Sequence, residues 1–420
     1  MPNFALHKLK VPTLLSAFIT LLNDRLGETI VFPLLPFLLD RFTNSGSTLG
    51  LLAGTYAISQ FAVAPLIGAL SDRFGRKPII IACVAGSVIG LSLFAITISL
   101  NWEKILPGTT MGIPLLFLFL ARVIDGISGG TATTATAILA DISTPENRAK
   151  TFGLIGVAFG LGFLLGPGLG TTLAQYNVNL PVWAATGFAL LNLSLVTWFL
   201  PETHPKSARS KLPRKRELNP ITQLSLVFQQ SSLRRLCLAF FLFFMAFNGF
   251  TAILVLYLKQ SFHWTPEMAS LTFVVVGIVA MIVQGGLIGP LVKTFGELKL
   301  TLSGIGFVIV GCILLPIANK NNAIPTVFTA VAILALGTGL VTPCLRALIS
   351  RKLNASNQGA ILGSLQGLQS LGTFIGAATA GISYDLLGAK SPFYGTTLLL
   401  IVVIALISTR SLTERTRYKV

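Results

Sequence analysis

Gly68-Ala-Leu-Ser-Asp-Arg-Phe-Gly-Arg-Lys-Pro78 is a short charged stretch between two long apolar segments. A degraded copy, Gly289-Pro-Leu-Val-Lys-Thr-Phe-Gly296, lies in the other half of the chain. Other matching residues share one common offset: Asn147 and Asn357, Gly153 and Gly363, Gly162 and Gly372, Gly166 and Gly376. The first copy concentrates charge in a tight turn at a membrane surface. Together the copies indicate a chain built from two similar halves.

The composition excludes an ordinary soluble domain. The 420-residue chain is 53% hydrophobic and only 11% charged, whereas charged residues make up about a quarter of a typical globular domain. Apolar runs recur at roughly 20 residues, the length that spans about 30 Å of hydrocarbon. They are too long and too uniformly apolar for the strands of a membrane barrel. The sequence therefore predicts an all-α membrane protein with two pseudo-symmetric six-helix bundles.

Twelve membrane-spanning helices are predicted, at residues 12–39, 47–70, 78–99, 112–140, 151–175, 181–200, 234–258, 266–292, 298–318, 324–349, 358–387 and 392–409. They form an N-terminal bundle at 1–200 and a C-terminal bundle at 233–420. A basic linker with several prolines occupies 201–232. Within it, 221–228 is expected either as a short amphipathic helix on the membrane surface or as a solvated loop.

The net charge of +17 suggests a nucleic-acid partner at first, but the positions of the basic residues explain it differently. Lys and Arg gather at the N-terminus, in every second loop, in the linker and at the C-terminus. The opposite loops hold only Arg41, Lys104, Lys259, Lys320 and Lys390. This asymmetry follows the positive-inside rule. Both termini are therefore predicted to be cytoplasmic in a multi-pass protein of the cell membrane, with no nucleic-acid partner.

An enzymatic role is not expected. The sequence holds no nucleotide-binding P-loop, and its four cysteines fall inside predicted helices without metal-ligand spacing. The three histidines lie in loops or near membrane surfaces. We predict neither a cofactor nor a metal site.

Several motifs resemble those of the major facilitator superfamily. Gly68–Pro78 resembles the loop between helices 2 and 3 of that family, and Leu120–Gly129 is similar to its helix 4 motif. Gly162–Gly170 is similar to the helix 5 motif that marks its antiporters, and Pro201–Thr203 fits the end of helix 6. The resemblance covers the whole chain and implies two bundles that rock around a central site.

A narrower resemblance is to the tetracycline/proton antiporters and their multidrug-efflux relatives. The residues that carry it are Asp24–Gly27 followed by Pro33–Pro36, and Ala140–Ile142 with Arg148. This likeness implies export coupled to protons. Asp125 and Glu28 depart from the tetracycline pattern, which argues against a tetracycline-like substrate and for a different coupling residue.

Ionisable residues lie near the middle of two predicted helices, namely Asp24, Arg25 and Glu28 in the first and Arg122 and Asp125 in the fourth. A charge at that depth costs at least about 2.5 kcal/mol and usually serves a function, although paired charges can also simply hold helices together. Residues three apart can pair on one helical face, so Arg25 is expected to pair with Glu28 and Arg122 with Asp125. Asp24 is then left over, or it reaches Arg122 and releases Asp125. The least-paired acid is the best proton carrier, so Asp24 leads and Asp125 and Glu28 follow.

The family resemblance implies a conformational latch in the loop after the second helix, formed by Gly68, Asp72, Arg73, Gly75 and Arg76 with Asp141. Asp72 is expected to dock at the N-terminus of helix 11, whose free N–H groups form a positive pole. Arg76 is expected to pair with Asp141 at the cytoplasmic end of helix 4. The alternative is a solvated loop that obeys the positive-inside rule.

Gly162, Gly166 and Gly170, beside Pro167, form a stripe of small residues that allows close helix packing. The resemblance places this stripe at the interface between the halves, against helix 8, which carries Gly285, Gly286 and Gly289. The alternative is packing within one half.

The second half shows no mid-membrane charge comparable with those of the first. Its candidates for a substrate cavity are the amides Asn248, Gln284, Gln366 and Gln369, each of which could instead form an interhelical hydrogen bond. The phenylalanines of helix 7, between Phe240 and Phe250, are expected mainly to face lipid, with Phe247 or Phe250 as possible cavity residues.

The sequence thus predicts a proton-coupled exporter of amphipathic or cationic small molecules that works by alternating access. Its expected partners are the substrate, protons and the lipid bilayer, and it is expected to act as a monomer. A lipid flippase or metabolite exporter is the alternative, because Arg25 and Arg122 could hold an anionic head group. A nutrient symporter fits the helix 5 stripe less well.

Overall fold

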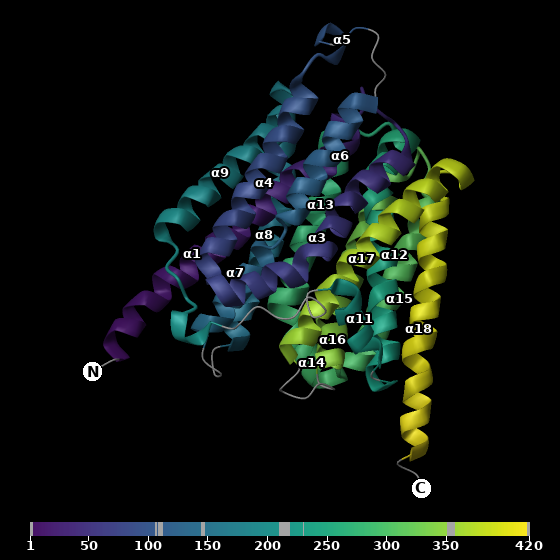
Figure 1. The fold of residues 1–420 in the computed structure, drawn as a ribbon. Coiled ribbons are helices and arrows are strands. Elements are labelled where there is room, and N and C mark those ends of the chain that lie inside the picture. The colour runs from purple at the N-terminus through teal and green to yellow at the C-terminus, as the bar shows by residue number, and fades with distance from the viewer. Residues whose placement is uncertain are drawn as a thin grey trace. The chain divides into compact units, whose positions relative to one another are not determined.

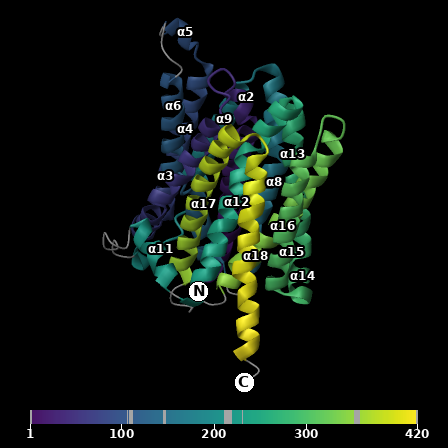
Figure 2. The same ribbon diagram turned by 90° about the vertical axis from the view of Figure 1, so that its right-hand side faces the viewer.

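The computed structural model describes residues 3–105, 107, 112–143, 148–209, 219–229, 231–350 and 358–417. All regular elements in these ranges are helices (Figures 1 and 2). Ten helical segments of this part of the chain are long and apolar enough to cross a membrane. The structure therefore confirms the all-α membrane class, and the count of twelve spans stays a prediction.

The first half contains α1 (Asn3–Val31), η1 (Phe32–Leu34), α2 (Leu35–Leu38), α3 (Gly46–Phe74), α4 (Arg76–Ser99), α5 (Trp102–Ile105), α6 (Gly112–Ile127), α7 (Thr131–Ile142), α8 (Arg148–Tyr176) and α9 (Leu180–Phe199). The linker holds η2 (Lys206–Ala208). The second half contains α11 (Pro220–Gln229), α12 (Ser231–Phe262), α13 (Pro266–Ile282), η3 (Val283–Leu287), α14 (Ile288–Phe295), α15 (Glu297–Ile317), α16 (Ala323–Ser350), α17 (Gln358–Leu387) and α18 (Ser391–Arg417).

The chain folds into two compact units. Unit 1 comprises Met1–Thr43 and Ala62–Asn219, and unit 2 comprises Asn44–Phe61 and Pro220–Val420. The division falls within α3, whose first half belongs to unit 2 and whose second half belongs to unit 1. The predicted domain limits at 200 and 233 assign the whole of this helix to the N-terminal bundle, and they stay a prediction.

In unit 1, α1 packs against α7, α8 and α9, and α4 packs against α6 and α9 (Figure 1). A core of aliphatic side chains, including Leu21, Ile80 and Ile138, fills the space between these helices. The predicted fourth span is interrupted: α6 ends at Ile127 and α7 begins at Thr131. Gly129 and Gly130 lie at this break, and glycine is a poor helix former, so the interruption has a local cause in the sequence.

In unit 2, α12 lies beside α17 and α18, and α15 lies beside α16 (Figures 1 and 2). Phe240, Phe243, Phe244 and Phe250 of α12 are buried within this unit. The expectation that this aromatic row mainly faces lipid is therefore wrong, because α17 and α18 cover it. The predicted span at 266–292 contains a π-helical turn, η3, around Gly285 and Gly286. Residues 221–228, expected as a surface helix or a loop, lie within the helix α11.

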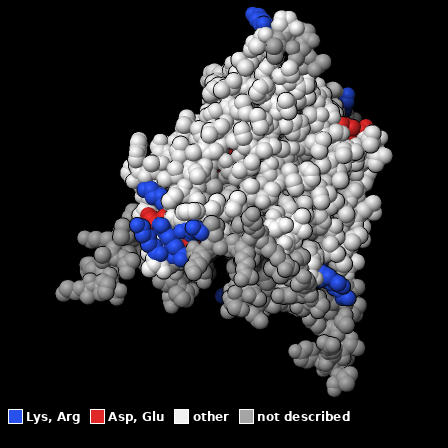
Figure 3. All heavy atoms as spheres, in the orientation of Figure 1, with Lys and Arg blue, Asp and Glu red and all other residues white. Residues whose placement is uncertain are grey.

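The molecular surface shows the charge distribution expected of a membrane protein. On the face drawn in Figure 3, Lys, Arg, Asp and Glu form a few separate groups, and most of the remaining described surface is uncharged. Many large apolar side chains, such as Leu116, Trp198 and Leu398, are exposed. An apolar band of this kind is stable only when lipid replaces water around it.

The contact between α1 and α8 gives a test of the packing. A Cβ added at Gly170 would lie 2.5 Å from the main-chain oxygen of Ile30, whereas one added at Gly168 on the same helix meets nothing within 4 Å. Gly170→Ala should therefore lower the free energy of unfolding by about 1–3 kcal/mol, the usual cost of overpacking. Gly168→Ala is the control, since both changes bring the same gain in helix propensity.

The readout is thermal unfolding followed with a thiol-reactive dye, because Cys83, Cys237, Cys312 and Cys344 are all buried in the folded protein. Equal unfolding temperatures for the two variants would contradict the close packing of α8 on α1.

Candidate functional site

A cluster of buried charge lies on α1. The Arg25 guanidinium contacts Asp24 with Nη2 at 2.7 Å and Glu28 with Nη1. The side chains of Arg25 and Asp24 are 14% and 21% exposed, and that of Glu28 is 48% exposed. Arg25 also lies over the ring of Phe159. The pairing of Arg25 with Glu28 is confirmed, but Asp24 is not left over, because one guanidinium can bind two carboxylates.

The second part of the cluster lies on α6. Arg122 Nη1 is 3.5 Å from Asp125 Oδ2, and both side chains are about 15% exposed. Asp125 also accepts a hydrogen bond from Ser87 of α4, and a Cβ added at Gly90 would lie 2.9 Å from its Cβ. Gly90 thus lets α4 approach Asp125 closely. Among the three acids, Asp125 is the most buried and has the longest contact with its arginine. The least-paired position therefore belongs to Asp125 and not to Asp24.

The loop between α3 and α4 forms a second polar cluster. Arg76 Nε donates to Asp141 Oδ2 at 3.0 Å, and its Nη1 donates to Asp72 Oδ1 at 2.6 Å and to Ser71 Oγ at 2.9 Å. The expected pair of Arg76 and Asp141 is present and joins α4 to α7. Arg76 is buried, so its charge depends on these acceptors.

Glu202 is a member of this cluster whose role the sequence did not reveal. Its carboxylate accepts hydrogen bonds from the main-chain nitrogens of Arg76 at 2.9 Å and Lys77 at 3.3 Å, and so it caps the N-terminus of α4. Gly75, with φ +107°, is required before this helix, because a Cβ there would collide with Glu202. Through these hydrogen bonds, the Pro201-Glu202-Thr203 motif links the end of α9 to the start of α4.

The remaining latch residues are only partly buried or exposed. The Asp72 side chain is 50% exposed, Arg73 lies over the ring of Phe74, and nothing lies within 4 Å of a Cβ added at Gly68. The predicted dock for Asp72, near Asn357, lies outside the described residues. The latch role of this loop stays a prediction.

The glycine stripe of α8 faces α1. Cβ atoms added at Gly162, Gly166 and Gly170 would meet Arg25, Thr29 and Ile30 respectively, and Thr29 Oγ1 donates to the oxygen of Gly162 at 2.8 Å. Pro167 is buried beside the stripe. The stripe thus packs within one half, as the alternative prediction had it. The packing also positions the charged turn of α1, since Gly162 leaves room for the Arg25 side chain. A role for the stripe at the interface between the halves stays a prediction.

The predicted cavity amides of unit 2 have different surroundings. Asn248 donates to the oxygen of Phe244 in its own helix at 3.0 Å, and Gln284 is exposed in η3. Gln366 is partly buried. Gln369 accepts a hydrogen bond from Arg346 Nη2 at 2.6 Å. Arg346 lies within α16, four residues before its end at Ser350. That the second half has no mid-membrane charge comparable with those of the first stays a prediction.

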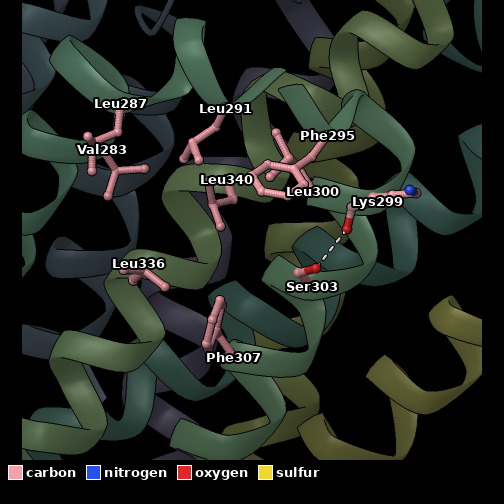
Figure 4. A pocket seen from close by; sticks show the side chains of 10 residues that line it. All are labelled: Val283, Leu287, Leu291, Phe295, Lys299, Leu300, Ser303, Phe307, Leu336 and Leu340. Carbon is pink, nitrogen blue, oxygen red and sulfur yellow. Dashed lines mark hydrogen bonds between the residues drawn. The ribbon is translucent and has the colours of Figure 1, made fainter. Parts of the chain in front are cut away.

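Unit 2 also has a groove of about 380 Å³ between the η3–α14 segment, α15 and α16 (Figure 4). Its lining is apolar apart from Ser303 and Lys299, and Figure 4 shows the nitrogen of Lys299 pointing away from the leucines. The predicted cavity amides do not line it. Such a lining cannot orient a charged molecule, so the groove is not the candidate site.

A clamp at the predicted outer end of α3 was also missed. Asp385, in the last turn of α17, accepts hydrogen bonds from Gly46 N and Ser47 N, both at 2.8 Å, and from the hydroxyls of Ser45 and Ser47 at 2.7 and 2.6 Å. It thus caps the N-terminus of α3, where a carboxylate is favourable. Cβ atoms added at Gly50 and Gly381 would collide with the facing helix. The four-residue spacing of Gly46, Gly50 and Gly54 was the available sequence signal.

Comparison with known proteins agrees with this architecture. The family model described as Major Facilitator Superfamily matches residues 17–377 and, in a second match, residues 236–419. The chain belongs to the major facilitator superfamily. It is 33% identical to the class C tetracycline resistance protein of Escherichia coli over 361 residues, which cover 85% of this chain and 86% of that protein.

Two further members of the superfamily bear on the site. Multidrug resistance protein 2 of Bacillus subtilis (strain 168) is 28% identical over 375 residues, which cover 86% of each chain. The crystal structure of the human organic anion transporter MFSD10 (TETRAN) superposes with a TM-score of 0.72 at 27% identity, covering 95% of this chain and 99% of that one. Family and relatives are transporters.

The clamp between Asp385 and α3 can be tested by a single substitution. Asp385→Asn removes the charge that binds two main-chain N–H groups and two hydroxyls. Because hydrogen bonds to charged groups contribute about 1.5–3 kcal/mol each, amide exchange at the start of α3 should accelerate at least about tenfold. The measurement is hydrogen–deuterium exchange of peptides covering 44–54, with Glu267→Gln in the first turn of α13 as the control. Unchanged exchange in Asp385→Asn would show that the cap does not hold this helix end.

Proposed function

We propose that this protein is a proton-coupled exporter of amphipathic or cationic small molecules, working by alternating access in the cell membrane. The observation that carries the proposal is the intramembrane charge of unit 1, where Asp24 and Glu28 pair with Arg25 and Asp125 pairs with Arg122. Asp24 and Glu28 also act electrostatically on Asp125, so the five groups influence one another. Together they hold one more acid than base. A proton on Asp125 and a cationic substrate near these groups both reduce the same net negative charge, so each disfavours the other, which is the simplest basis for exchange.

Asp125 is the proposed proton carrier. Its side chain on α6 is largely buried, and its 3.5 Å contact with Arg122 is longer than a normal hydrogen bond. Asp24, by contrast, has a 2.7 Å ion pair with Arg25, which keeps its charge compensated. An acid that must gain and lose a proton needs a cationic partner near enough to stabilise its ionised form. The partner must not be so near that the acid cannot be protonated. Asp125 meets this condition best.

Arg25 is the proposed organiser of the cluster. It holds Asp24 and Glu28 on one helical turn, and Gly162 and Phe159 of α8 surround its side chain. A movement of α8 would thus be felt by the charges on α1. This gives a physical connection between helix packing and the acids that exchange protons.

The relatives support export as the direction of transport, because the similar proteins include tetracycline and multidrug resistance proteins. Anionic metabolites are a second candidate substrate class. The reading in which Arg25 and Arg122 bind an anionic head group is weakened, since both arginines pair with acids. Two observations nevertheless favour anionic metabolites as the second class: the similarity to an organic anion transporter, and the presence of Arg346 in unit 2.

The coupling role is tested with export of ethidium, an amphipathic cation, from proteoliposomes that carry an imposed pH gradient. Asp125→Asn should abolish the dependence of export on the gradient, because the carrier can no longer exchange a proton, while exchange of internal for external ethidium continues. Asp24→Asn should reduce both activities, because Arg25 loses an acceptor.

Glu103→Gln is the matched control, since Glu103 is an exposed acid of α5 outside the cluster. Gradient-driven export that persists in Asp125→Asn would refute its assignment as the carrier. Absence of any proton-dependent export of ethidium by the unsubstituted protein would count against a proton-coupled exporter of cations.

A further inference from the structure

Arg346 is a charged residue of unit 2 that the mechanism above does not use. It lies in the last turns of α16, and its guanidinium reaches Gln369 of α17. Its side chain is exposed to solvent. Charged residues of membrane-spanning helices usually face a water-filled path and mark substrate or ion sites, so Arg346 is a candidate for such a site.

The direction of the Arg346 side chain argues against a merely structural role. Arginines near helix ends normally extend toward the membrane surface. Side chains on a helix lean toward its N-terminus, which for Arg346 is the direction away from the near end of α16 at Ser350. Gln369 lies 11 residues after the first residue of α17, Gln358, about 17 Å along that helix at 1.5 Å per residue. The hydrogen bond to Gln369 therefore holds the guanidinium away from the near end of α16.

Among the described residues, the Arg346 guanidinium has one hydrogen-bond partner, the amide oxygen of Gln369. This bond uses one of the five N–H donors of a guanidinium. None of the ion pairs formed among the described residues includes Arg346. This differs from Arg25, Arg76 and Arg122, each of which contacts a carboxylate of its own unit. A solvated arginine with remaining donors is suited to bind a planar anion such as a carboxylate.

We propose that Arg346 binds a carboxylate group of the exported molecule and that Gln369 positions its guanidinium. The inference rests on the proposed export function and adds that, among amphipathic substrates, those that carry a carboxylate bind more tightly. The amide of Gln369 holds one edge of the guanidinium through Nη2, which directs the remaining donors. Its own N–H₂ group is a further donor on the same face of the site. Gln369 is thus a positioning residue, and Arg346 makes the contact with the substrate.

Rhodamine B and rhodamine B ethyl ester form a matched pair of probes, because they differ only in a free or esterified carboxylate. Their binding to the purified full-length protein is measured by fluorescence polarisation. In Arg346→Gln, the affinity for rhodamine B should fall at least about tenfold, the effect expected when a hydrogen bond to a charged group is lost. The affinity for the ester should stay within about twofold, since the ester has no carboxylate to lose.

Arg346→Lys should retain part of the preference for the acid, and Gln369→Leu should weaken it without abolishing it. Arg234→Gln, which removes an exposed arginine at the start of α12, should leave both affinities unchanged. Binding of the ester also shows that each variant is folded. An equal loss of affinity for both dyes in Arg346→Gln would overturn the assignment. So would the lack of any carboxylate preference in the unsubstituted protein, whether it binds both dyes or neither.

Failure of the proposed function is seen separately. Gradient-driven export of the ester by Arg346→Gln at the rate of the unsubstituted protein supports the exporter, whatever the binding of the acid shows. Selective loss of rhodamine B binding in Arg346→Gln, without proton-dependent export of either dye, would support the carboxylate site and contradict the exporter.

Discussion

The cost of holding charge among apolar helices governs the structure around the candidate site. Arg25 shares its guanidinium between Asp24 and Glu28, and the same side chain occupies the space that Gly162 leaves open on α8. The charge pairing and the helix packing are thus one arrangement. A Cβ at Gly162 would lie 2.9 Å from the Cβ of Arg25, so a larger residue there would displace this side chain or separate α8 from α1. Asp125 and Arg122 repeat the principle on α6 with a longer, weaker contact.

Helix ends supply the second set of polar interactions, and α3 connects them. At its first turn Asp385 caps the helix, and after its last turn the loop is fixed by Arg76, Asp141 and Glu202. The clamp belongs to unit 2 and the loop cluster to unit 1, because the division between the units falls within α3.

Much of this architecture could be predicted because apolar length, glycine spacing and charge asymmetry are local properties of a sequence. The helical class and the ion pairs three residues apart are of this kind, whereas the pair of Arg76 with Asp141 was predicted from the family resemblance. The omissions concern other contacts between distant residues. Nothing near Asp385 in sequence indicates that it caps α3, and nothing near Arg346 indicates that it reaches Gln369 of α17. The aromatic row of α12 was misplaced because lipid-facing and buried apolar surfaces have the same composition.

The central claim is that a buried carboxyl group of unit 1 changes its protonation state when substrate binds. Infrared difference spectroscopy of the protein with and without ethidium measures this directly, because a protonated carboxyl has a carbonyl band that a carboxylate lacks. The account predicts that a protonated-carboxyl band is lost on binding and that this change is missing in Asp125→Asn. A difference spectrum without a carboxyl band, or one that persists unchanged in Asp125→Asn, would contradict it.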